Sequence, residues 1–312
     1  MSEKLPRSRS KAEDRATIQA SHETLRHDGD HWVLAGPNNL RQRIKAPGLV
    51  PAVENAIAIL EALNILAPQP ASLAELATSL NISRSHCHSI LKTLVSYGWI
   101  SFDERAKDYR LDIGVMASIS SVFRSGTLDV IRQVSNELAG RVQVPVTLTK
   151  HQPDGGYVLI DKFNVYGVME VSFPIGHCYP EDAVGQMRAM LAWQKPDFID
   201  KWLKNWHPRK YTKHTLINKA KVREKIDETR VRGYSVSDEE FTEGTFVLSA
   251  PIFDREGNVS FLLTCTSMKE VMSSREKAVG KELVSALAQI HARTGAHPPI
   301  EFARILAAAS PW

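Results

Sequence analysis

The chain has 312 residues, a length typical of about two domains, and its 43% hydrophobic and 24% charged residues describe an ordinary globular protein. A net charge of +4 excludes a polycation that coats nucleic acid along its whole length, so any DNA contact must be local. No apolar run approaches the ~20 residues that a membrane-spanning helix needs. Cys87, Cys178 and Cys265 lie far apart without C-x-x-C spacing. We therefore expect a cytoplasmic protein without disulfides.

Residues 1–48 mix charged groups with few apolar ones, and several glycines and prolines interrupt any longer element. We predict a mobile arm with a short helix near residues 15–25 and an apolar spot at Trp32–Leu34. The basic residues between 41 and 45 could touch phosphates, but a solvated tail is the favoured interpretation.

Two short helices separated by a tight break are predicted between residues 72 and 95. Ser72 and Glu75 have the spacing of a capping box, so the first helix begins at Ser72. Asn81 and Ile82 break the chain, and Ser83 is a good N-cap for the second helix. The leading polar groups of that helix are Arg84, Ser85, His86 and Ser89. This pattern indicates a helix-turn-helix whose leading groups contact base edges, although an ordinary two-helix hairpin is the alternative.

A third helix and a hairpin flank this pair. Apolar residues from Val53 to Leu63 recur at helical spacing, with Ala56, Ile57 and Leu60 between them. Segments 99–102 and 109–111 alternate like two strands joined by a polar turn. Three helices closed by a hairpin predict a winged helix over residues 49–112. The cations of its wing, Arg105, Lys107 and Arg110, are candidates for phosphate contacts.

Beyond the wing, apolar residues recur every three or four positions from Ile113 to Phe123, which predicts a linker helix within residues 113–126 that packs at a dimer seam. A helix over 128–142 should follow. Further strands are predicted at 144–150, 157–161, 168–173, 247–253 and 260–266, and helices at about 181–193, 196–206, 219–232 and 274–291. This order predicts an α+β domain over residues 127–297 with a central antiparallel sheet, followed by a tail over 298–312.

Four groups of side chains could suggest other chemistry. His86 and His88 lie on nearly opposite sides of a helix, so they cannot chelate one metal ion; we expect DNA contact for His86 and packing for His88. The cluster of His177, Cys178, Glu181 and Asp182 is better explained as a polar helix cap with a half-buried cysteine. The acidic run at 238–240 lacks a nucleophile or phosphate loop, which favours a structural turn. The helical spacing of Trp193, Trp202 and Trp206 favours a core or interface role over a ligand cage.

From Val50 to about His297 the chain resembles the IclR family of transcriptional regulators. The resemblance rests on the helix-turn-helix, on Gly98-Trp99-Ile100 and Ala183-Val184-Gly185, and on the blocks 232–244 and 249–257. It implies a winged helix, a linker helix and a GAF-like effector domain. It further implies homodimers or homotetramers that bind double-stranded operator or promoter DNA and control catabolic genes in response to a small molecule.

The resemblance also implies an effector pocket lined by Ala183, Val184, Gly185, Ser237, Val247, Thr264 and Thr266. The N–H groups at a helix start are free donors, and threonines two apart on a strand face one side. The chain departs from the family at Glu181-Asp182, and Ser237 stands where an acid is usual. Two carboxylates in the first turn would disfavour a ligand anion, so we predict a neutral or weakly basic effector.

The alternative function is an enzyme acting on a small carboxylate, with the helix-turn-helix as an interaction module. It needs a nucleophile or a metal site in the second domain, and the sequence suggests neither. We therefore expect a DNA-binding regulator that is not an enzyme and needs no cofactor or metal. The sequence does not distinguish a repressor from an activator.

Overall fold

The computed structural model describes residues 25–28, 31–34, 48–123, 126–153, 155–169 and 173–309. The chain forms two compact units, residues 1–123 and 124–312. The helix predicted near residues 15–25 and the basic residues at 41–45 lie outside the described residues. The apolar spot at Trp32–Leu34 forms a strand of a two-stranded antiparallel hairpin, β1 (Leu25–Asp28) and β2 (His31–Leu34).

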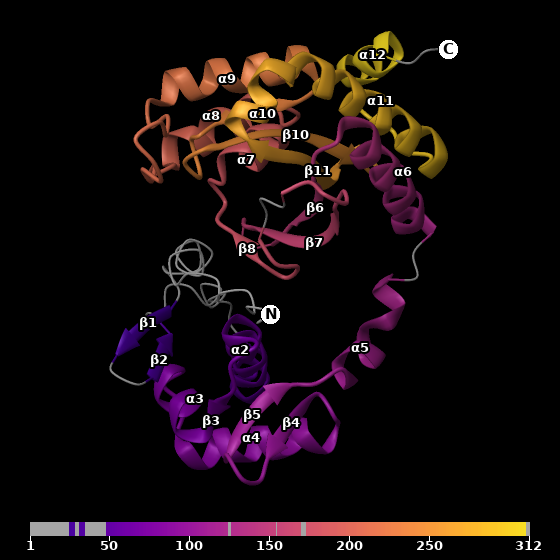
Figure 1. Cartoon of the computed structure of the whole chain (residues 1–312). Helices are drawn as coiled ribbons and strands as arrows, with labels where there is room; N and C mark the ends of the chain where they lie inside the picture. Colours follow the sequence, from indigo (N-terminus) through magenta and orange to yellow (C-terminus); the bar gives the residue numbers. More distant parts are fainter. Residues whose placement is uncertain are drawn as a thin grey trace, which may run out of the picture. The chain divides into compact units, whose positions relative to one another are not determined.

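The first unit is built mainly from three helices and a small sheet (Figure 1). Its further elements are α2 (Pro51–Leu66), β3 (Ala71–Ser72), α3 (Leu73–Ser79), α4 (Arg84–Ser96), β4 (Ile100–Asp103), β5 (Asp108–Leu111), α5 (Gly114–Ile119) and the 3-10 turn η1 (Ser120–Phe123). The sheet has the antiparallel order β3-β5-β4. The predicted wing strands are thus confirmed to within one residue, and β3 ties the wing to the start of α3.

The core of this unit forms where α2, α3 and α4 meet the wing. Ile59 and Leu63 of α2 pack with Leu91 of α4 in one buried cluster. The predicted apolar stripe of α2 is only partly correct, because Val53 and Ile57 are about half exposed. The buried face is rotated toward Ile59 because α2 contacts both α4 and β5.

The segment after the wing begins with a close backbone contact. A Cβ on Gly114 would lie 2.0 Å from the carbonyl oxygen of Gly98, so this contact requires glycine at position 114. Trp99 Nε1 also donates to Ser118 Oγ at 3.1 Å. The single helix predicted here is in fact α5 followed by the η1 turn.

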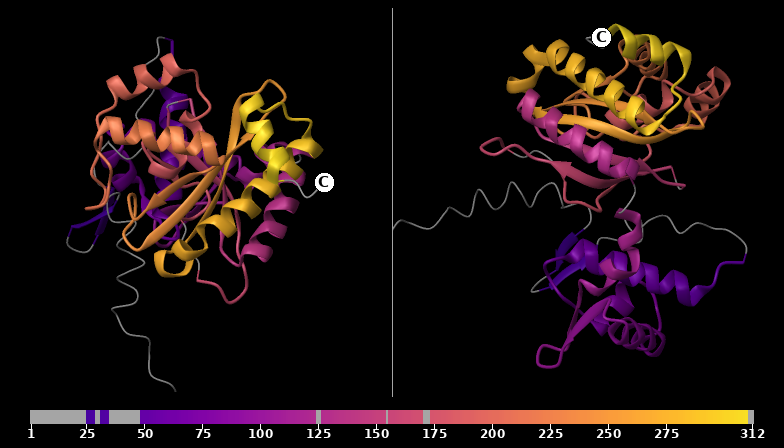
Figure 2. Two further views of the ribbon diagram at one scale, coloured as in Figure 1. Left: turned by 90° about the horizontal axis from the view of Figure 1, so that it is seen from above. Right: turned by 90° about the vertical axis from the view of Figure 1, so that its right-hand side faces the viewer.

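The second unit contains a six-stranded sheet and seven α-helices among its described residues (Figure 2). Its strands are β6 (Val146–His151), β7 (Tyr157–Phe163), β8 (Cys178–Tyr179), β9 (Ser235–Asp238), β10 (Thr245–Phe253) and β11 (Val259–Met268). Its helices are α6 (Gly126–Val142), α7 (Val184–Leu191), α8 (Pro196–Asn205), α9 (Lys219–Arg232), α10 (Lys269–Met272), α11 (Glu276–Thr294) and α12 (Ile300–Ala309), with a 3-10 turn η2 (Ser273–Arg275).

The sheet has the order β8-β7-β6-β11-β10-β9, and all neighbours are antiparallel. One face packs against α6 and α11, which lie side by side (Figure 2). Alternate residues of β10, such as Leu248 and Ala250, point into this core, and α7 lies over the opposite face. The α+β prediction with a central antiparallel sheet is confirmed.

Two expectations for this unit were wrong, and one strand was missed. Residues 168–169 and 173 are not in a strand, while 170–172 lie outside the described residues; the strand beside β7 is β8. Strand β9 was missed because only its pairing with β10 extends these four residues. Residues 300–309, expected in a tail, form α12, whose Phe302 is fully buried against Trp193.

Candidate DNA-binding and effector-binding sites

Side-chain caps determine where α3 and α4 begin. Ser72 Oγ accepts from the N–H of Glu75 at 3.3 Å, and Glu75 Oε2 accepts from the N–H of Ser72 at 2.7 Å, so the predicted capping box is present. Ser83 Oγ accepts from the N–H of His86 at 3.4 Å. Between the helices, Asn81 has a left-handed φ of 53°, a conformation that asparagine tolerates. The first turn of α4 is therefore held directly after a sharp turn.

The exposed face of α4 contains most of the residues predicted to contact bases. Arg84, Ser85 and Ser89 are exposed, whereas His86 is half-buried. The Ser89 hydroxyl donates to the Ser85 carbonyl at 3.1 Å, which leaves its oxygen able to accept a hydrogen bond. This face can therefore offer a guanidinium and short hydroxyls to base edges.

His88 and Lys92 extend the same face. Both side chains are exposed, and they follow Arg84 at intervals of four residues, which places all three on one side of the helix. The expected packing of His88 is wrong, because the neighbouring Cys87 takes the core position and is fully buried. Lys92 was missed by the sequence reasoning, although its spacing from Arg84 was an available signal.

The wing presents Arg105, Lys107 and Arg110, all exposed. Lys107 Nζ lies 2.9 Å from Glu104 Oε2, and an Arg110 nitrogen lies 4.0 Å from Asp108 Oδ2. Ion pairs between such exposed side chains contribute at most about 1 kcal/mol, so a phosphate oxygen can replace the acid.

Hydroxyl side chains line the face of the large sheet that lies under α7. Ser235 is opposite Ser249, Ser249 is opposite Thr264, and Thr264 is opposite Thr147, so one row crosses four strands. Ser249 Oγ lies 2.8 Å from Thr264 Oγ1, and Ser235 Oγ donates to the carbonyl of Gly185 at 2.7 Å. These contacts attach the first turn of α7 to a polar strip of the sheet.

The structure brings together four of the predicted effector residues. A Cβ on Gly185 would lie 3.3 Å from Val247 Cγ1 and 4.0 Å from Ser237 Cβ. Val247 is in turn opposite Thr266 across β10 and β11. A further predicted effector residue, Thr264, lies in the adjoining row of hydroxyl side chains. The helix can approach the strands this closely because residue 185 has no side chain.

The N-terminus of α7 is buried and lacks a side-chain cap. Its N-cap residue Ala183 is fully buried, Val184 is 5% exposed, and no side chain accepts from the first turn within the described part of the chain. The first N–H groups of a helix have no intrahelical acceptor. This end of α7 can therefore donate hydrogen bonds to a ligand atom that accepts them.

Only one of the two carboxylates before α7 points inward. Asp182 is buried, and it accepts from Tyr211 Oη at 2.5 Å and from Trp206 Nε1 at 3.4 Å. Glu181 is exposed. Sequence reasoning missed Tyr211, which lies 29 residues from Asp182 in a loop whose position depends on the tertiary fold.

Two further buried hydroxyls lie on the α7 side of the sheet. Tyr157 is 1% exposed and Thr149 is fully buried, and neither hydroxyl has a hydrogen-bond partner in the described structure. Burial raises the pKa of the Tyr157 phenol, and the charges of Glu181 and Asp182 raise it further. Sequence reasoning missed both residues, since neither strand pattern marks them as different from core residues.

His177 belongs to an aromatic cluster. Its ring stacks on Phe173 with centroids 4.0 Å apart and meets Tyr179 edge-on at 4.7 Å, and burial lowers its pKa to about 4. Cys178 is exposed, not half-buried as expected. Within the described residues, no three His, Cys, Asp or Glu side chains form a group able to hold a metal.

The acidic run at 238–240 is occupied by ion pairs. Lys269 Nζ lies 2.9 Å from Asp238 and 2.6 Å from Glu239. Glu240 forms a bidentate ion pair with Arg188, in which both N–O distances are 2.7 Å and both side chains are buried. These carboxylates therefore connect β9, α7 and α10 and are not available as a catalytic pair.

A capped helix pair with an exposed polar second helix and a β-wing is the architecture of a DNA-binding winged helix-turn-helix. No helix of the described residues is long and apolar enough to cross a membrane. Comparison with known families agrees with this class. The profile described as "IclR helix-turn-helix domain" matches residues 52–104, and "Bacterial transcriptional regulator IclR C-terminal" matches residues 122–292.

The chain belongs to the IclR family of ligand-responsive transcriptional regulators, which bind DNA and are not enzymes. It is 29% identical over 188 residues to the transcriptional repressor IclR of Escherichia coli, covering 59% of this chain and 68% of that protein. The fold resembles the crystal structure of an IclR regulator from Alicyclobacillus acidocaldarius, with a TM-score of 0.73, 20% identity and coverage of 79% and 100%. An IclR homologue from Microbacterium hydrocarbonoxydans, solved with 4-hydroxybenzoate, has a TM-score of 0.65, 16% identity and coverage of 78% and 99%.

Proposed function

We propose that α4 reads an operator in the major groove through Arg84, Ser85, His88 and Ser89, with Lys92 on a flanking phosphate. His86, predicted from the sequence as a base contact, is ranked second because it is half-buried. The observation that carries this proposal is the continuous exposed polar face that begins at the capped end of α4. Arg105, Lys107 and Arg110 of the wing then hold phosphates and fix the register of the helix.

The test compares Arg84→Ala with Lys107→Ala on a DNA fragment recovered by footprinting upstream of the gene. Arg84→Ala should cost about 1–3 kcal/mol on that fragment and less on unrelated DNA. Lys107→Ala should weaken binding to the operator fragment and to unrelated DNA equally, and it should reduce the salt dependence of that binding. Unchanged operator affinity in Arg84→Ala would exclude α4 as the reading helix.

The second unit binds its effector, in this proposal, between the start of α7 and the hydroxyl face of the sheet. The pocket includes the seven residues predicted from the sequence together with Asp182, Thr149 and Tyr157. Two observations support this location. The N-terminus of α7 is buried without a cap, and two buried hydroxyls lack partners on the same side of the sheet. Both groups can donate to acceptor atoms of a ligand.

The expected effector is a neutral molecule with carbonyl-type acceptors. Asp182 is buried beside the helix start and already balances the positive end of its dipole. An anion near Tyr157 would be disfavoured in the same way as the phenolate, first by burial and then by the charges of Glu181 and Asp182. Both carboxylates contribute to this discrimination. Solvent screens the charge of the exposed Glu181 more than that of the buried Asp182.

Calorimetry with 4-hydroxybenzamide and 4-hydroxybenzoate provides matched probes, since a solved relative binds the acid. The amide should bind at least about fivefold more tightly, the effect of one charge at ~4 Å in high dielectric. Asp182→Asn and Glu181→Gln should each narrow the ratio of amide affinity to acid affinity, because both charges act at Tyr157. Equal binding of acid and amide would contradict the charge argument. Unaltered binding in a folded Gly185→Val variant would instead contradict the location.

We also propose a homodimer or homotetramer assembled partly through α5. Ile113, Met116 and Ile119 are exposed on this short segment, with Ile113 81% exposed. The Phe123 side chain, proposed from the sequence as part of the seam, lies outside the described side chains. Met116→Asp should lower the mass in solution, whereas Tyr166→Asp, at an exposed position of the second unit, should not. A dimeric Met116→Asp variant would exclude this seam.

Because the partner of this protein is chromosomal DNA, we place the protein in the cytoplasm.

A further inference from the structure

The segment from the second half of α8 to the first turn of α9 is strongly basic. Residues 201–223 contain eight lysines and arginines and no aspartate or glutamate, although the whole chain has a net charge of only +4. The remainder of the chain therefore has a net negative charge. Seven of the eight side chains are exposed: Lys201, Lys204, Arg209, Lys210, Lys213, Lys219 and Lys221.

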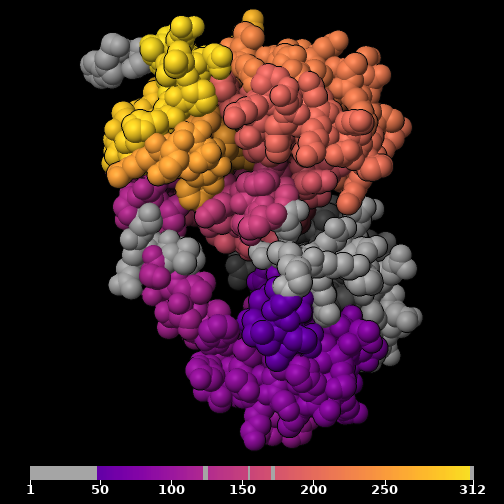
Figure 3. Space-filling model, turned by 180° about the vertical axis from the view of Figure 1, so that it is seen from behind, coloured from indigo at the N-terminus to yellow at the C-terminus, as the bar shows by residue number. Residues whose placement is uncertain are grey.

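These cations lie on neighbouring elements. Lys219 Nζ donates to the carbonyl of Lys204 at 2.9 Å, which brings the start of α9 against the end of α8. Arg223 of α9 pairs with Asp200 of α8. The two helices and the loop that joins them thus form one continuous surface, coloured salmon to orange in Figure 3. We call residues 201–223 the basic face.

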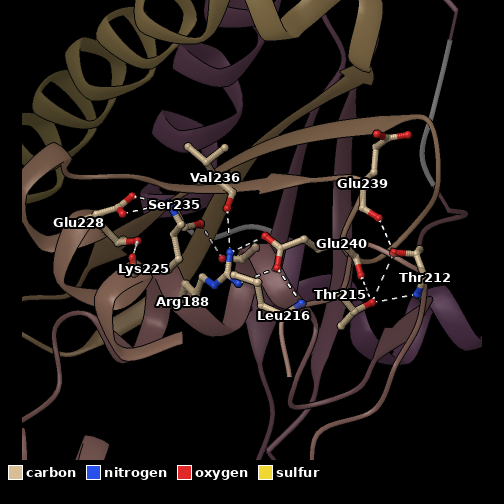
Figure 4. A network of polar contacts seen from close by, with 12 residues as sticks. Arg188, Thr212, Thr215, Leu216, Lys225, Glu228, Ser235, Val236, Glu239 and Glu240 are labelled. Atoms are coloured by element: carbon tan, nitrogen blue, oxygen red, sulfur yellow. Dashed lines mark hydrogen bonds and ion pairs between the residues drawn. The ribbon is translucent and has the colours of Figure 1, made fainter. Parts of the chain in front are cut away.

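The loop of the basic face is held in place by hydrogen bonds from two buried threonines (Figure 4). Thr212 Oγ1 donates to the carbonyl of Glu239 at 2.7 Å, and Thr215 Oγ1 donates to the carbonyl of Glu240 at 2.7 Å. The three loop cations Arg209, Lys210 and Lys213 form no ion pair with any part of the chain that the structure describes. An ordered loop with unpaired charges has an electrostatic repulsion that a bound polyanion would relieve.

We propose that the basic face binds the phosphate backbone of duplex DNA, giving the effector-binding unit a DNA contact separate from α4 and the wing. Six of the eight cations are lysines, which suit phosphates as point charges. Lysine is depleted in the centres of protein–protein interfaces, so an acidic protein partner is less favoured. The contact is independent of base sequence and depends steeply on salt.

The test measures binding of the full chain to a mixed-sequence duplex of about 60 base pairs at several salt concentrations. The variant combines Arg209→Gln, Lys210→Gln and Lys213→Gln. The control combines Lys277→Gln, Lys281→Gln and Arg304→Gln, which are exposed on α11 and α12 of the same unit and change the net charge equally. The negative slope of log affinity against log salt should become shallower by about 2–3 in the variant alone, since each phosphate contact contributes about −0.9 to it.

A photo-crosslinking residue at position 210 provides a second readout and should attach to the duplex, whereas one at position 281 should not. Equal slopes in the variant and the control would overturn the proposal, because only the net charge would then matter. Unchanged DNA binding combined with altered transcription from the target promoter would also overturn it, in favour of an acidic protein partner.

Discussion

The buried pair between Arg188 and Glu240 should be the costliest ion pair to break in the second unit. Their side chains are 1% and 9% exposed, and two charge-assisted hydrogen bonds of 2.7 Å join them. Arg188 also donates to the carbonyl of Val236 at 3.0 Å, and the N–H of Leu216 donates to Glu240 at 3.3 Å (Figure 4). Glu240→Ala would leave a guanidinium buried without its counter-charge.

Removing one partner of such a pair costs about 3–5 kcal/mol, because the remaining charge stays desolvated. In a unit of this size that loss corresponds to a fall in Tm of roughly 6–20 °C. By contrast, the pair between Arg141 and Glu282 has side chains that are 39% and 42% exposed. Glu282→Ala should therefore cost less than about 1 kcal/mol.

Urea unfolding followed by circular dichroism measures these differences, with the slope of the transition used to check that each variant unfolds in the same manner. The double variant Arg188→Met with Glu240→Leu should be more stable than Glu240→Ala, because it leaves no unpaired charge. If Glu240→Ala and Glu282→Ala lose the same free energy, the pair does not stabilise α7 against β9 as the geometry indicates.

Three further outcomes test the packing. Ser72→Ala should lower the free energy of unfolding by about 0.5–2 kcal/mol, because the capping box is lost; an unchanged urea midpoint would contradict its role. Gly280→Ala should destabilise by more than about 1 kcal/mol, since a Cβ would lie 2.4 Å from the ring of Tyr234; wild-type thermal stability would show that the ring moves freely. Burial lowers the pKa of His291 to about 4, below its unfolded value of 6.5. Its contribution of about 3 kcal/mol to the free energy of unfolding is therefore present above pH 6.5 and lost as the pH falls through 4. Urea unfolding from pH 7 to 4 should show a smaller loss of stability in His291→Gln than in the wild type.

Features that depend on residues close together in the chain could be read from the sequence. The capping box joins residues three apart, and the wing strands alternate around a four-residue turn, so α3, α4 and the wing were predicted nearly at their observed bounds. The buried stripe of α6 follows from helical periodicity in the same way. In each case the determining interaction is a local hydrogen bond or a repeat of apolar residues, which tertiary contacts only reinforce.

Features that depend on distant pairs were decided by the tertiary structure. Strand β9 exists through its pairing with β10, and α12 is held by Phe302 against Trp193, more than a hundred residues earlier. At the proposed pocket, the seven positions implied by family resemblance gave a location, but only the fold turned Asp182 inward, 29 residues from Tyr211, and left Glu181 exposed. The direction in which a side chain points depends on which surfaces meet to bury apolar area, and no local pattern contains that information.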